Sequence, residues 1–448
     1  MSNRPRSPVI VLLGLMVTAC VDQPTDLLQQ LQIPAAAAVW IERNSLGFQH
    51  VELSASLDEL EPLRAMMGSA RMVALGEATH GTREFFQMKA RLLRFLVERM
   101  GFSAFAIEAS WPEANRLDRY VRTGEGDPAA LLSGLYFWTW NTEEVMEMIR
   151  WMRAYNVAGG RVGFYGFDMQ YPGMAVDNVL KFIRVVDPSA LPDVSTRLYC
   201  VQVYANGPNG RFAPGRYGEI PPGSREGCLT DLTRVYDDLV RNKLPYEART
   251  SAAEYARALR SARVVIQWEG MESQRLTRDA AMAENALWLL EQLGPDGKIV
   301  LWAHNGHVSK AQNAMGPHLR AALGGDFMNI GFSFRGGSFT AVTQQGQTFL
   351  GLNAHTATEL IPHSYTYYLA AANRPQFVLD LRGRAASSDS TSWLLGPRSF
   401  RSIGCCFNPA LPQNYWYDTR LPAEFDAVIH FQTTNPSRLL PFLYPTSF

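Results

Sequence analysis

Residues 71–86 read RMVALGEATHGTREFF, and this stretch decides how the chain folds. Its apolar run at 72–75 predicts a short strand buried in a sheet. The run ends at a glycine, and a carboxylate, Glu77, and an imidazole, His80, follow directly. A helical pattern begins near Thr82. An acid and a histidine in a turn between a buried strand and a helix occupy the place where α/β proteins carry their reactive groups.

The helical pattern continues to the next glycine, and a second apolar run at 104–107 then ends on Glu108. Strand, helix and strand form a βαβ unit, so the two strands are expected to be parallel, with a right-handed crossover. Their carboxyl ends then lie at the same edge of the sheet. If the two strands are neighbours, about 4.8 Å separates them, and Glu108 stands beside Glu77 and His80.

Apolar runs that are followed at once by polar residues recur along the chain. Asp168 follows the run at 162–165, and His304 and His307 follow the run at 298–302. Three more strands are predicted at 327–332, 377–381 and 425–431. We predict an α/β fold: a mostly parallel sheet flanked by helices, with its functional groups at the carboxyl edge of the strands.

The composition is that of a soluble globular protein. The chain has 448 residues, of which 47% are hydrophobic and 19% are charged, so it can form a large core. Lys and Arg together number 42, as do Asp and Glu, and the net charge is therefore zero. No basic stripe indicates a nucleic-acid partner, and none is expected.

The N-terminus resembles the lipobox signal of bacterial lipoproteins. Arg4 and Arg6 precede an apolar run at 9–17, which is short for a membrane span, and small residues then lead to Cys20. In a lipobox the cysteine is lipidated and becomes the mature N-terminus. An ordinary secretory signal that happens to contain a cysteine is the alternative. The expected location is the bacterial envelope, in the periplasm, with the N-terminal lipid as the only membrane contact.

These signals divide the chain into three parts. A signal peptide is expected at 1–19, a tether at 21–38 and one domain at 39–448. Helical stretches and an irregular insert predict a partly helical lobe at about 170–295, over the carboxyl edge of the strands. The sequence predicts no oligomeric state.

Export would also affect the cysteines. In an oxidising compartment Cys200 and Cys228 can close a loop, but two unpaired thiols are equally compatible with the sequence, because connectivity cannot be read from spacing. Cys405 and Cys406 are adjacent, in a predicted loop, and lack the spacing of a zinc or thioredoxin motif.

The polar residues at the strand ends suggest hydrolysis by activated water. No Gly-x-Ser-x-Gly elbow, P-loop or Gly-x-Gly-x-x-Gly follows a strand, which argues against a serine hydrolase and a nucleotide-binding enzyme. His80 can act as a general base whose tautomer Glu77 fixes. Glu108 can hold the water or a second imidazole, and His304, together with His307, can act as an acid or an oxyanion donor. This chemistry needs neither a covalent nucleophile nor a cofactor.

Each of these residues has another reading. His304 and His307 with Glu77 or Glu108 can form a metal site, although His-x-x-His in a loop is a weaker signal than His-Glu-x-x-His on a helix. Asp168 contributes to substrate binding or only caps a helix. The aromatic stretch at 137–141 lines an apolar substrate cleft or belongs to the core.

Seven blocks of the sequence resemble the erythromycin esterase family: LGEATHGTREF, FAIEASW, FYGFDMQ, LWAHNGHV, RDAAMAENALWLL, FRSIG and FDAVIHF. The resemblance covers about residues 40–440. It implies an α/β core with a helical lobe over a deep cleft, and ester hydrolysis by water activated on His80. Family members that act on macrolides, and so confer antibiotic resistance, open the lactone ring.

The resemblance also implies roles for individual residues. Glu77, Glu108, His304 and His307 match active-site positions of the family, and Arg83 matches a residue expected to bind either substrate or Glu108. The predicted function is therefore hydrolysis of a small-molecule ester or lactone. A haem- or metal-binding lipoprotein and a metal-dependent peptidase or amidase share the broad fold and remain the alternatives.

Overall fold

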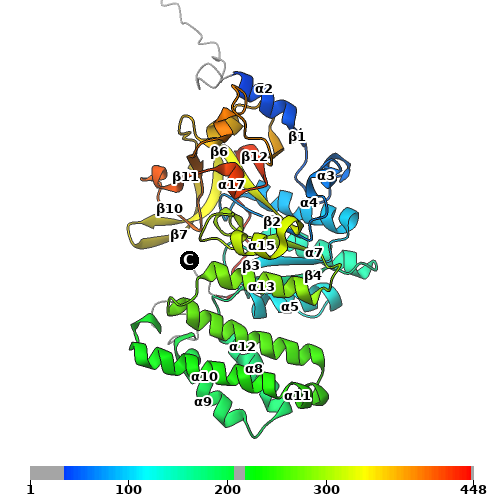
Figure 1. Cartoon of the computed structure of the whole chain (residues 1–448), viewed down its shortest axis with the longest axis vertical. Helices are drawn as coiled ribbons and strands as arrows, with labels where there is room; N and C mark the ends of the chain where they lie inside the picture. Colours follow the sequence, from blue (N-terminus) through cyan, green and yellow to red (C-terminus); the bar gives the residue numbers. More distant parts are fainter. Residues whose placement is uncertain (1–34, 206–216, 445–448) are drawn as a thin grey trace, which may run out of the picture.

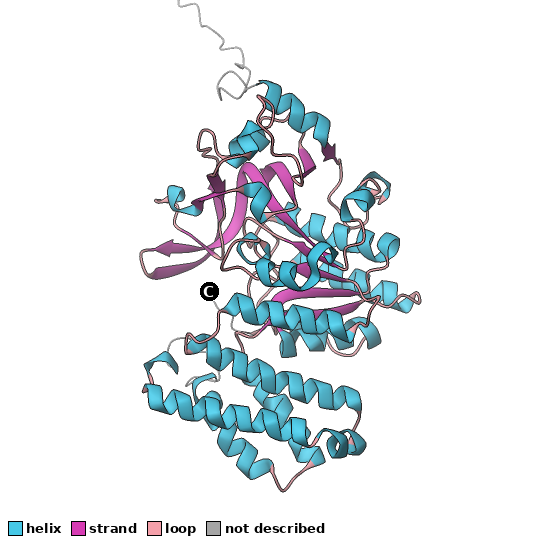
Figure 2. Cartoon of the chain, viewed as in Figure 1, coloured by secondary structure: helices cyan, strands magenta, loops and turns pink. Residues whose placement is uncertain are grey.

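The structure is a computed structural model that describes residues 35–205 and 217–444. Within these residues the centre is a ten-stranded sheet in the order β1-β8-β12-β6-β2-β5-β3-β4, with β7 and β10 paired to β6 (Figure 2). Helices cover both faces of the sheet. The predicted α/β fold with a mostly parallel sheet is therefore confirmed. The strands of the parallel part are β2 (Met72–Leu75), β3 (Ala104–Ser110), β4 (Gly163–Asp168), β5 (Ile299–Trp302), β6 (Phe327–Gln345), β10 (Cys406–Phe407) and β12 (Ala427–Thr434).

Strand β5 lies between β2 and β3, and it is parallel to both. The condition that β2 and β3 are neighbours is therefore not met, although their carboxyl ends do lie at the same edge. The right-handed βαβ rule fixes direction and handedness but leaves room for a strand from far along the chain. The insertion of β5 brings the loop after Trp302 between the loops that follow β2 and β3.

Residues of β2 alternate between two cores. Val73 and Leu75 pack with helices α4 (Arg83–Met100) and α7 (Glu143–Val157) in the core on one face of the sheet. Met72 and Ala74 belong to the core on the other face. Because both faces are covered, the strand carries no polar residue. Helix α4 ends at Gly101, whose φ of 74° is the left-handed conformation that favours glycine at a helix end.

The sheet also has an antiparallel part that the sequence did not predict. Strand β6 extends well beyond the predicted 327–332 and forms a hairpin with β7 (Thr348–Ala357). Residues 335–338 of β6 are half-buried, residues 339–342 are buried, and Gln345 at its end is exposed. The remaining strands are β1 (Ser45–Gly47), β8 (Gln376–Asp380), β9 (Arg398–Arg401) and β11 (Trp416–Thr419), of which β9 and β11 pair apart from the main sheet.

The helical lobe is built from α8 to α12 and lies below β4, α5 (Trp111–Thr123) and α13 in Figure 1. The chain enters the lobe from the carboxyl end of β4 and leaves it before α13 (Arg278–Gln292), which packs against β4 and not in the lobe. The lobe is therefore shorter than the predicted 170–295. Its helices are α8 (Gly173–Val186), α9 (Leu191–Ala205), α10 (Pro222–Arg241), α11 (Lys243–Arg249) and α12 (Ala252–Glu272).

A disulfide joins Cys200 on α9 to Cys228 on α10, with 5.9 Å between the two Cα atoms. This is one of the two arrangements that the sequence left open. A disulfide that closes this loop limits the conformational freedom of the unfolded lobe. Cys405 and Cys406 are free thiols.

The N-terminal predictions lie mostly outside the described residues, including the signal peptide at 1–19 and lipidation at Cys20. The predicted tether at 21–38 overlaps helix α2 (Ala35–Asn44), in which Ala37 and Ala38 are buried, so the folded domain begins earlier than expected. In the described part of the chain, no helix is long and apolar enough to cross a membrane. The other helices are α3 (Leu63–Met67), α5 (Trp111–Thr123), α6 (Pro128–Ser133), α14 (Asn305–Val308), α15 (Gly316–Leu323), α16 (Tyr365–Ala370) and α17 (Leu421–Glu424).

Candidate active site

Three adjacent strand ends form the site. Glu77 follows β2, His304 follows β5, and Glu108 lies near the end of β3. Two hydrogen bonds connect these segments: the Asn305 amide donates to the Glu77 carbonyl over 2.9 Å, and the His304 amide donates to Glu108 Oε2 over 2.9 Å. The predicted convergence of these residues on one sheet edge is present, with the β5 loop as its centre.

Glu77 and His80 form a buried acid–histidine pair. His80 Nδ1 lies 2.6 Å from Glu77 Oε1, and Glu77 is fully buried. The other oxygen, Oε2, accepts hydrogen bonds from Trp302 Nε1, over 2.8 Å, and from Lys89 Nζ. Burial raises the pKa of Glu77, but the charges and hydrogen bonds of Lys89 and His80 outweigh it, and the net shift is downward. Glu77 is therefore ionised and accepts the Nδ1 proton of His80.

Lys89 is a site residue that the sequence analysis missed. It extends from α4 into the core, and its ammonium lies 4.1 Å from the centre of the Trp302 ring. Burial lowers the pKa of Lys89 to about 8, although the negative charge of Glu77 acts to raise it. A lysine on the apolar stripe of a helix was the available signal, since such a position is rarely charged without a buried partner.

His80 is placed to act as a base. Burial lowers its pKa, but the hydrogen bond and charge of Glu77, with smaller effects of Glu108 and Cys405, produce a net rise. Because Nδ1 faces Glu77, the neutral ring carries its lone pair on Nε2, which has no hydrogen-bond partner among the described residues. The side chain is 12% exposed. A histidine in this state can take a proton from a water molecule.

His304 has the opposite character. Its Nδ1 accepts a hydrogen bond from the Gly306 amide over 3.1 Å, so the neutral ring carries its proton on Nε2. Burial, with the nearby charges of His80 and His307, lowers its pKa to about 3. The ring centres of His304 and His80 are 5.0 Å apart. His304 is therefore neutral, which suits an Nε2–H donor to an oxyanion and not a general acid.

His307 is held between two carboxylates. Its Nδ1 lies 2.8 Å from Asp279 Oδ1, and its Nε2 lies 3.2 Å from Glu108 Oε1. Burial lowers its pKa, but Glu108 and Asp279 outweigh burial and raise the pKa to about 9. Arg278 NH1 lies 3.0 Å from the same Nε2, so His307 has both ring nitrogens engaged by protein groups. It positions Glu108, and it has no proton free for a substrate.

Arg278, at the start of α13, is the second residue that the sequence analysis missed. Its NH2 group donates to Glu108 Oε1 over 2.7 Å, and Nε and NH2 donate to the two oxygens of Asp168 over 3.2 and 2.6 Å. The alternative reading of Asp168 as a helix cap is wrong, because α8 begins at Gly173 after an N-cap at Pro172. Asp168 instead holds Arg278 against Glu108, whose pKa lies well below its usual value despite burial.

Arg83 does not contact Glu108. Its Nε lies 3.7 Å from Glu144 Oε1, and its amide donates to the Asn435 carbonyl. The arginine that pairs with Glu108 is Arg278, and not Arg83. Substrate binding by Arg83 stays a prediction.

Most of the aromatic stretch at 137–141 is buried, in line with the core reading. Trp140 is buried and donates from Nε1 to the Glu108 carbonyl over 2.9 Å, with its ring centre 6.0 Å from that of His80. It therefore supports the site from the core. Phe137 is half-buried, and its ring centre lies 5.0 Å from that of Tyr171.

The donor atoms do not form a metal-binding set. Among the described residues, no group of three or more His, Cys, Asp or Glu side chains is arranged to hold a metal ion. His304 Nδ1 and both nitrogens of His307 are directed at protein groups, as are the oxygens of Glu108. Few donor atoms of His304, His307, Glu77 and Glu108 are therefore directed away from protein groups, and metal binding by this set stays a prediction.

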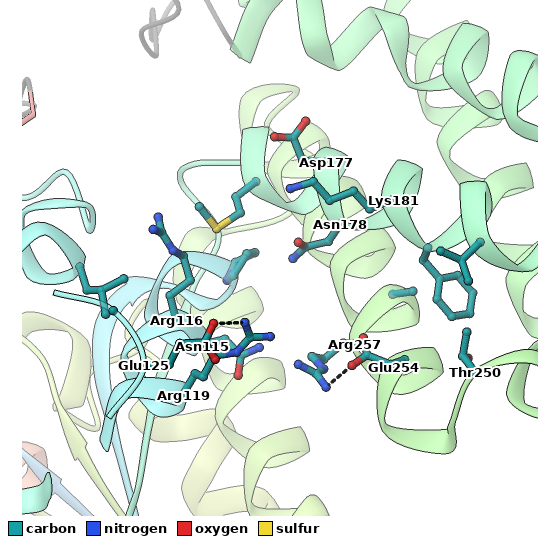
Figure 3. A pocket seen from close by; sticks show the side chains of 17 residues that line it. Asn115, Arg116, Arg119, Glu125, Asp177, Asn178, Lys181, Thr250, Glu254 and Arg257 are labelled. Carbon is teal, nitrogen blue, oxygen red and sulfur yellow. Dashed lines mark hydrogen bonds and ion pairs between the residues drawn. The ribbon is translucent and has the colours of Figure 1, made fainter. Parts of the chain in front are cut away.

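A separate cleft of about 770 Å³ lies between α5 and the lobe helices α8 and α12 (Figure 3). Mixed charges line it, and two of its arginines are paired within its wall, Arg119 with Glu125 and Arg257 with Glu254. None of the predicted site residues lines this cleft. The cleft is therefore distinct from the histidine cluster.

Comparisons with known proteins agree with the fold and identify the family. The family model described as erythromycin esterase matches residues 97–434, a range that contains Glu108 and His304 but begins after Glu77 and His80. Erythromycin esterase type II of Escherichia coli is 25% identical over 342 residues, which cover 70% of this chain and 80% of that protein. The putative hydrolase YbfO of Bacillus subtilis (strain 168) is 23% identical over 435 residues, covering 90% and 92%. A crystal structure of a succinoglycan biosynthesis protein has a TM-score of 0.78 and 26% identity, and the match covers 91% of this chain and 99% of that one.

Proposed function

Because the chain belongs to the erythromycin esterase family, we propose that it is a hydrolase that cleaves an ester or lactone with water activated by His80. The observation that carries the proposal is the Glu77–His80 pair, whose geometry leaves His80 Nε2 available as a base. The pair lies outside the range that the family model matches, so its support is the structure of the site itself.

The reaction proceeds in two steps. Neutral His80 takes a proton from water as the water oxygen attacks the carbonyl carbon, and ionised Glu77 stabilises the imidazolium that forms. The Nε2–H of His304 donates to the oxyanion of the tetrahedral intermediate. The intermediate then collapses, and His80 returns the proton to the departing alkoxide. Ester and water become acid and alcohol, and His80 is neutral again.

The remaining residues hold this arrangement. Glu108 accepts from the His304 amide, and Arg278 and His307 hold Glu108 in turn. Ser402 is not activated as a nucleophile: its Oγ lies 3.3 Å from His304 Nε2, but that nitrogen carries a proton. We therefore infer that water, and not Ser402, is the attacking group.

The test is a panel of esters, lactones including macrolides, and amides, assayed with and without a chelator. His80→Ala should lose hydrolysis by roughly 10²–10⁴-fold with the fold intact. His318→Ala, at an exposed histidine of α15, is the matched control and should keep full activity. Activity that survives in His80→Ala contradicts the proposal. Amide cleavage that disappears with chelator and returns with added metal would indicate the peptidase alternative, and a visible absorption band in the purified protein would indicate haem binding.

We also propose that the chain is exported and anchored by a lipid on Cys20. The support is the basic start, the short apolar run and the small residues before the cysteine. Labelled palmitate should enter the wild type and not Cys20→Ser, and the variant should leave the membrane fraction. Equal labelling of both proteins would exclude the anchor.

A further inference from the structure

Two free thiols lie on a segment that is attached to the active site. Ser402 Oγ lies 3.3 Å from His304 Nε2, and the Ile403 amide donates to the Ala78 carbonyl over 2.6 Å. On the other side, the Cys405 carbonyl accepts from the Val342 amide over 2.9 Å. The 402–406 segment therefore connects the turn after β2, the β5 loop and β6.

Cys405 and Cys406 are half-buried and free, and no step of the proposed reaction uses them. The interaction between the two neighbouring thiols, with help from the charge of His80, lowers the pKa of Cys405 against the effect of burial, and it raises the pKa of Cys406. Cys405 is therefore the more readily ionised of the two, and the thiolate is the reactive form in thiol–disulfide exchange.

We propose that Cys405 and Cys406 form a thiol–disulfide modification site, at which oxidation by a small-molecule disulfide switches the hydrolytic centre off. The Cys405 thiolate attacks the disulfide, a mixed disulfide forms, and one small thiolate leaves. Cys406 loses its proton to solvent and attacks the Cys405 sulfur, which releases the second small thiolate. Two protein thiols are oxidised to one disulfide, and the small disulfide is reduced to two thiols.

The product is expected to be easily reduced. Adjacent Cα atoms are about 3.8 Å apart, whereas unstrained disulfides have Cα separations of about 4.4–6.8 Å. Strained disulfides are the more readily reduced ones. Cys200 and Cys228, with Cα atoms 5.9 Å apart, lie within the unstrained range and should stay bonded under the same conditions.

Oxidation acts on the site in two ways. It removes the thiolate charge that helps to raise the pKa of His80. It also closes a small ring in the segment that places Ser402 against His304 and Ile403 against Ala78. Both changes disturb the groups assigned to base and oxyanion donor, so the switch rests on the proposed function.

The experiment treats the full chain with oxidised glutathione and follows both peptide masses and ester hydrolysis. The peptide that contains the two thiols should lose two hydrogens while hydrolysis falls about ten-fold or more, equivalent to about 1.4 kcal/mol, and dithiothreitol should restore both. Cys406→Ser should keep its hydrolysis before treatment and should stop at the mixed disulfide on Cys405. Reduced thiols after treatment, or a disulfide with unchanged hydrolysis, would overturn the switch.

A second readout keeps this test independent of turnover. The His80 resonance, assigned by its absence in His80→Gln, is titrated by NMR before and after oxidation. Oxidation should lower the pKa of His80 because the neighbouring negative charge is gone. If the untreated chain hydrolyses no ester, the proposed function fails, and this titration alone decides whether the thiol pair controls His80. An unchanged His80 titration would then contradict the switch.

Discussion

Arg278 donates from Nε and NH2 to both carboxylate oxygens of Asp168, and the same NH2 group reaches Glu108 over 2.7 Å. One guanidinium thus joins the ends of β4 and β3 through residues far apart in sequence. A planar fork matches two carboxylates in a way that a lysine ammonium cannot. Glu108 owes its position to this arrangement.

Arg278→Lys should therefore lower kcat by about 10–100-fold with little change in KM, since a hydrogen bond to a charged group contributes about 1.5–3 kcal/mol. The measurement is steady-state hydrolysis of the best ester from the panel. Arg275→Lys, at a neighbouring arginine that pairs with Glu269 and not with the site, should keep its kcat. Equal loss in both variants would indicate a general effect on the chain between α12 and α13.

Lys89 and Glu77 should show strong energetic coupling. Lys89→Met leaves Glu77 as a buried charge without its cation and should cost about 3–5 kcal/mol in the free energy of unfolding. The Lys89→Met/Glu77→Gln double variant removes both charges, and Gln still accepts from Trp302, so it should be more stable than Lys89→Met alone. Urea titrations of the wild type, both single variants and the double variant give the coupling. Additive destabilisation would show that the pair does not interact as described.

Glu113 should make stability depend on pH. Its carboxyl is buried, its Oε2 has no hydrogen-bond partner, and burial raises its pKa from 4.5 to about 8. The folded chain keeps this proton up to about pH 8, whereas the unfolded chain releases it near pH 4.5, so its contribution to stability falls as pH rises through this window.

Glu113→Gln should remove that loss, which amounts to roughly 2–5 kcal/mol at about 1.4 kcal/mol per pKa unit. The free energies of unfolding at pH 5, 6.5 and 8 measure this loss. The stability of the variant relative to the wild type should increase from each pH to the next. Glu291→Gln, at an exposed glutamate of α13, is the control and should follow the wild type. A constant difference between Glu113→Gln and the wild type would show that the buried carboxyl is ionised throughout.

Local patterns predicted the strand, the turn and the helix of residues 71–86 because each leaves a clear signal: an apolar run, a glycine and a helical period. The strand at 72–75 is β2 with the same bounds, and Glu77 and His80 are in contact three residues apart. Such short-range relationships follow from backbone geometry alone.

Long-range relationships could not be predicted in this way. Nothing near β2 indicates that β5 lies beside it, because a crossover can leave space for a later strand. Arg278 lies 170 residues from Glu108, and an arginine at the start of a helix reads as a solvent-exposed residue. Its contact with Glu108 depends on the packing of α13 against β4. Buried and half-buried residues of β6 beyond residue 332 come in blocks without the alternation of a half-buried strand, so no local pattern marks them as its continuation.

The central claim is that His80, supported by Glu77, is the base that activates water. The most direct test is the pH dependence of kcat/KM for ester hydrolysis in the wild type and in Lys89→Met/Glu77→Gln, which leaves no buried charge of that pair unpaired. In the wild type the rate should rise with pH as His80 loses its proton, with a midpoint above 6.5, because Glu77 raises the pKa of His80 overall. In the variant the midpoint should move to lower pH and the plateau should fall. A midpoint that is the same in both proteins would contradict the account.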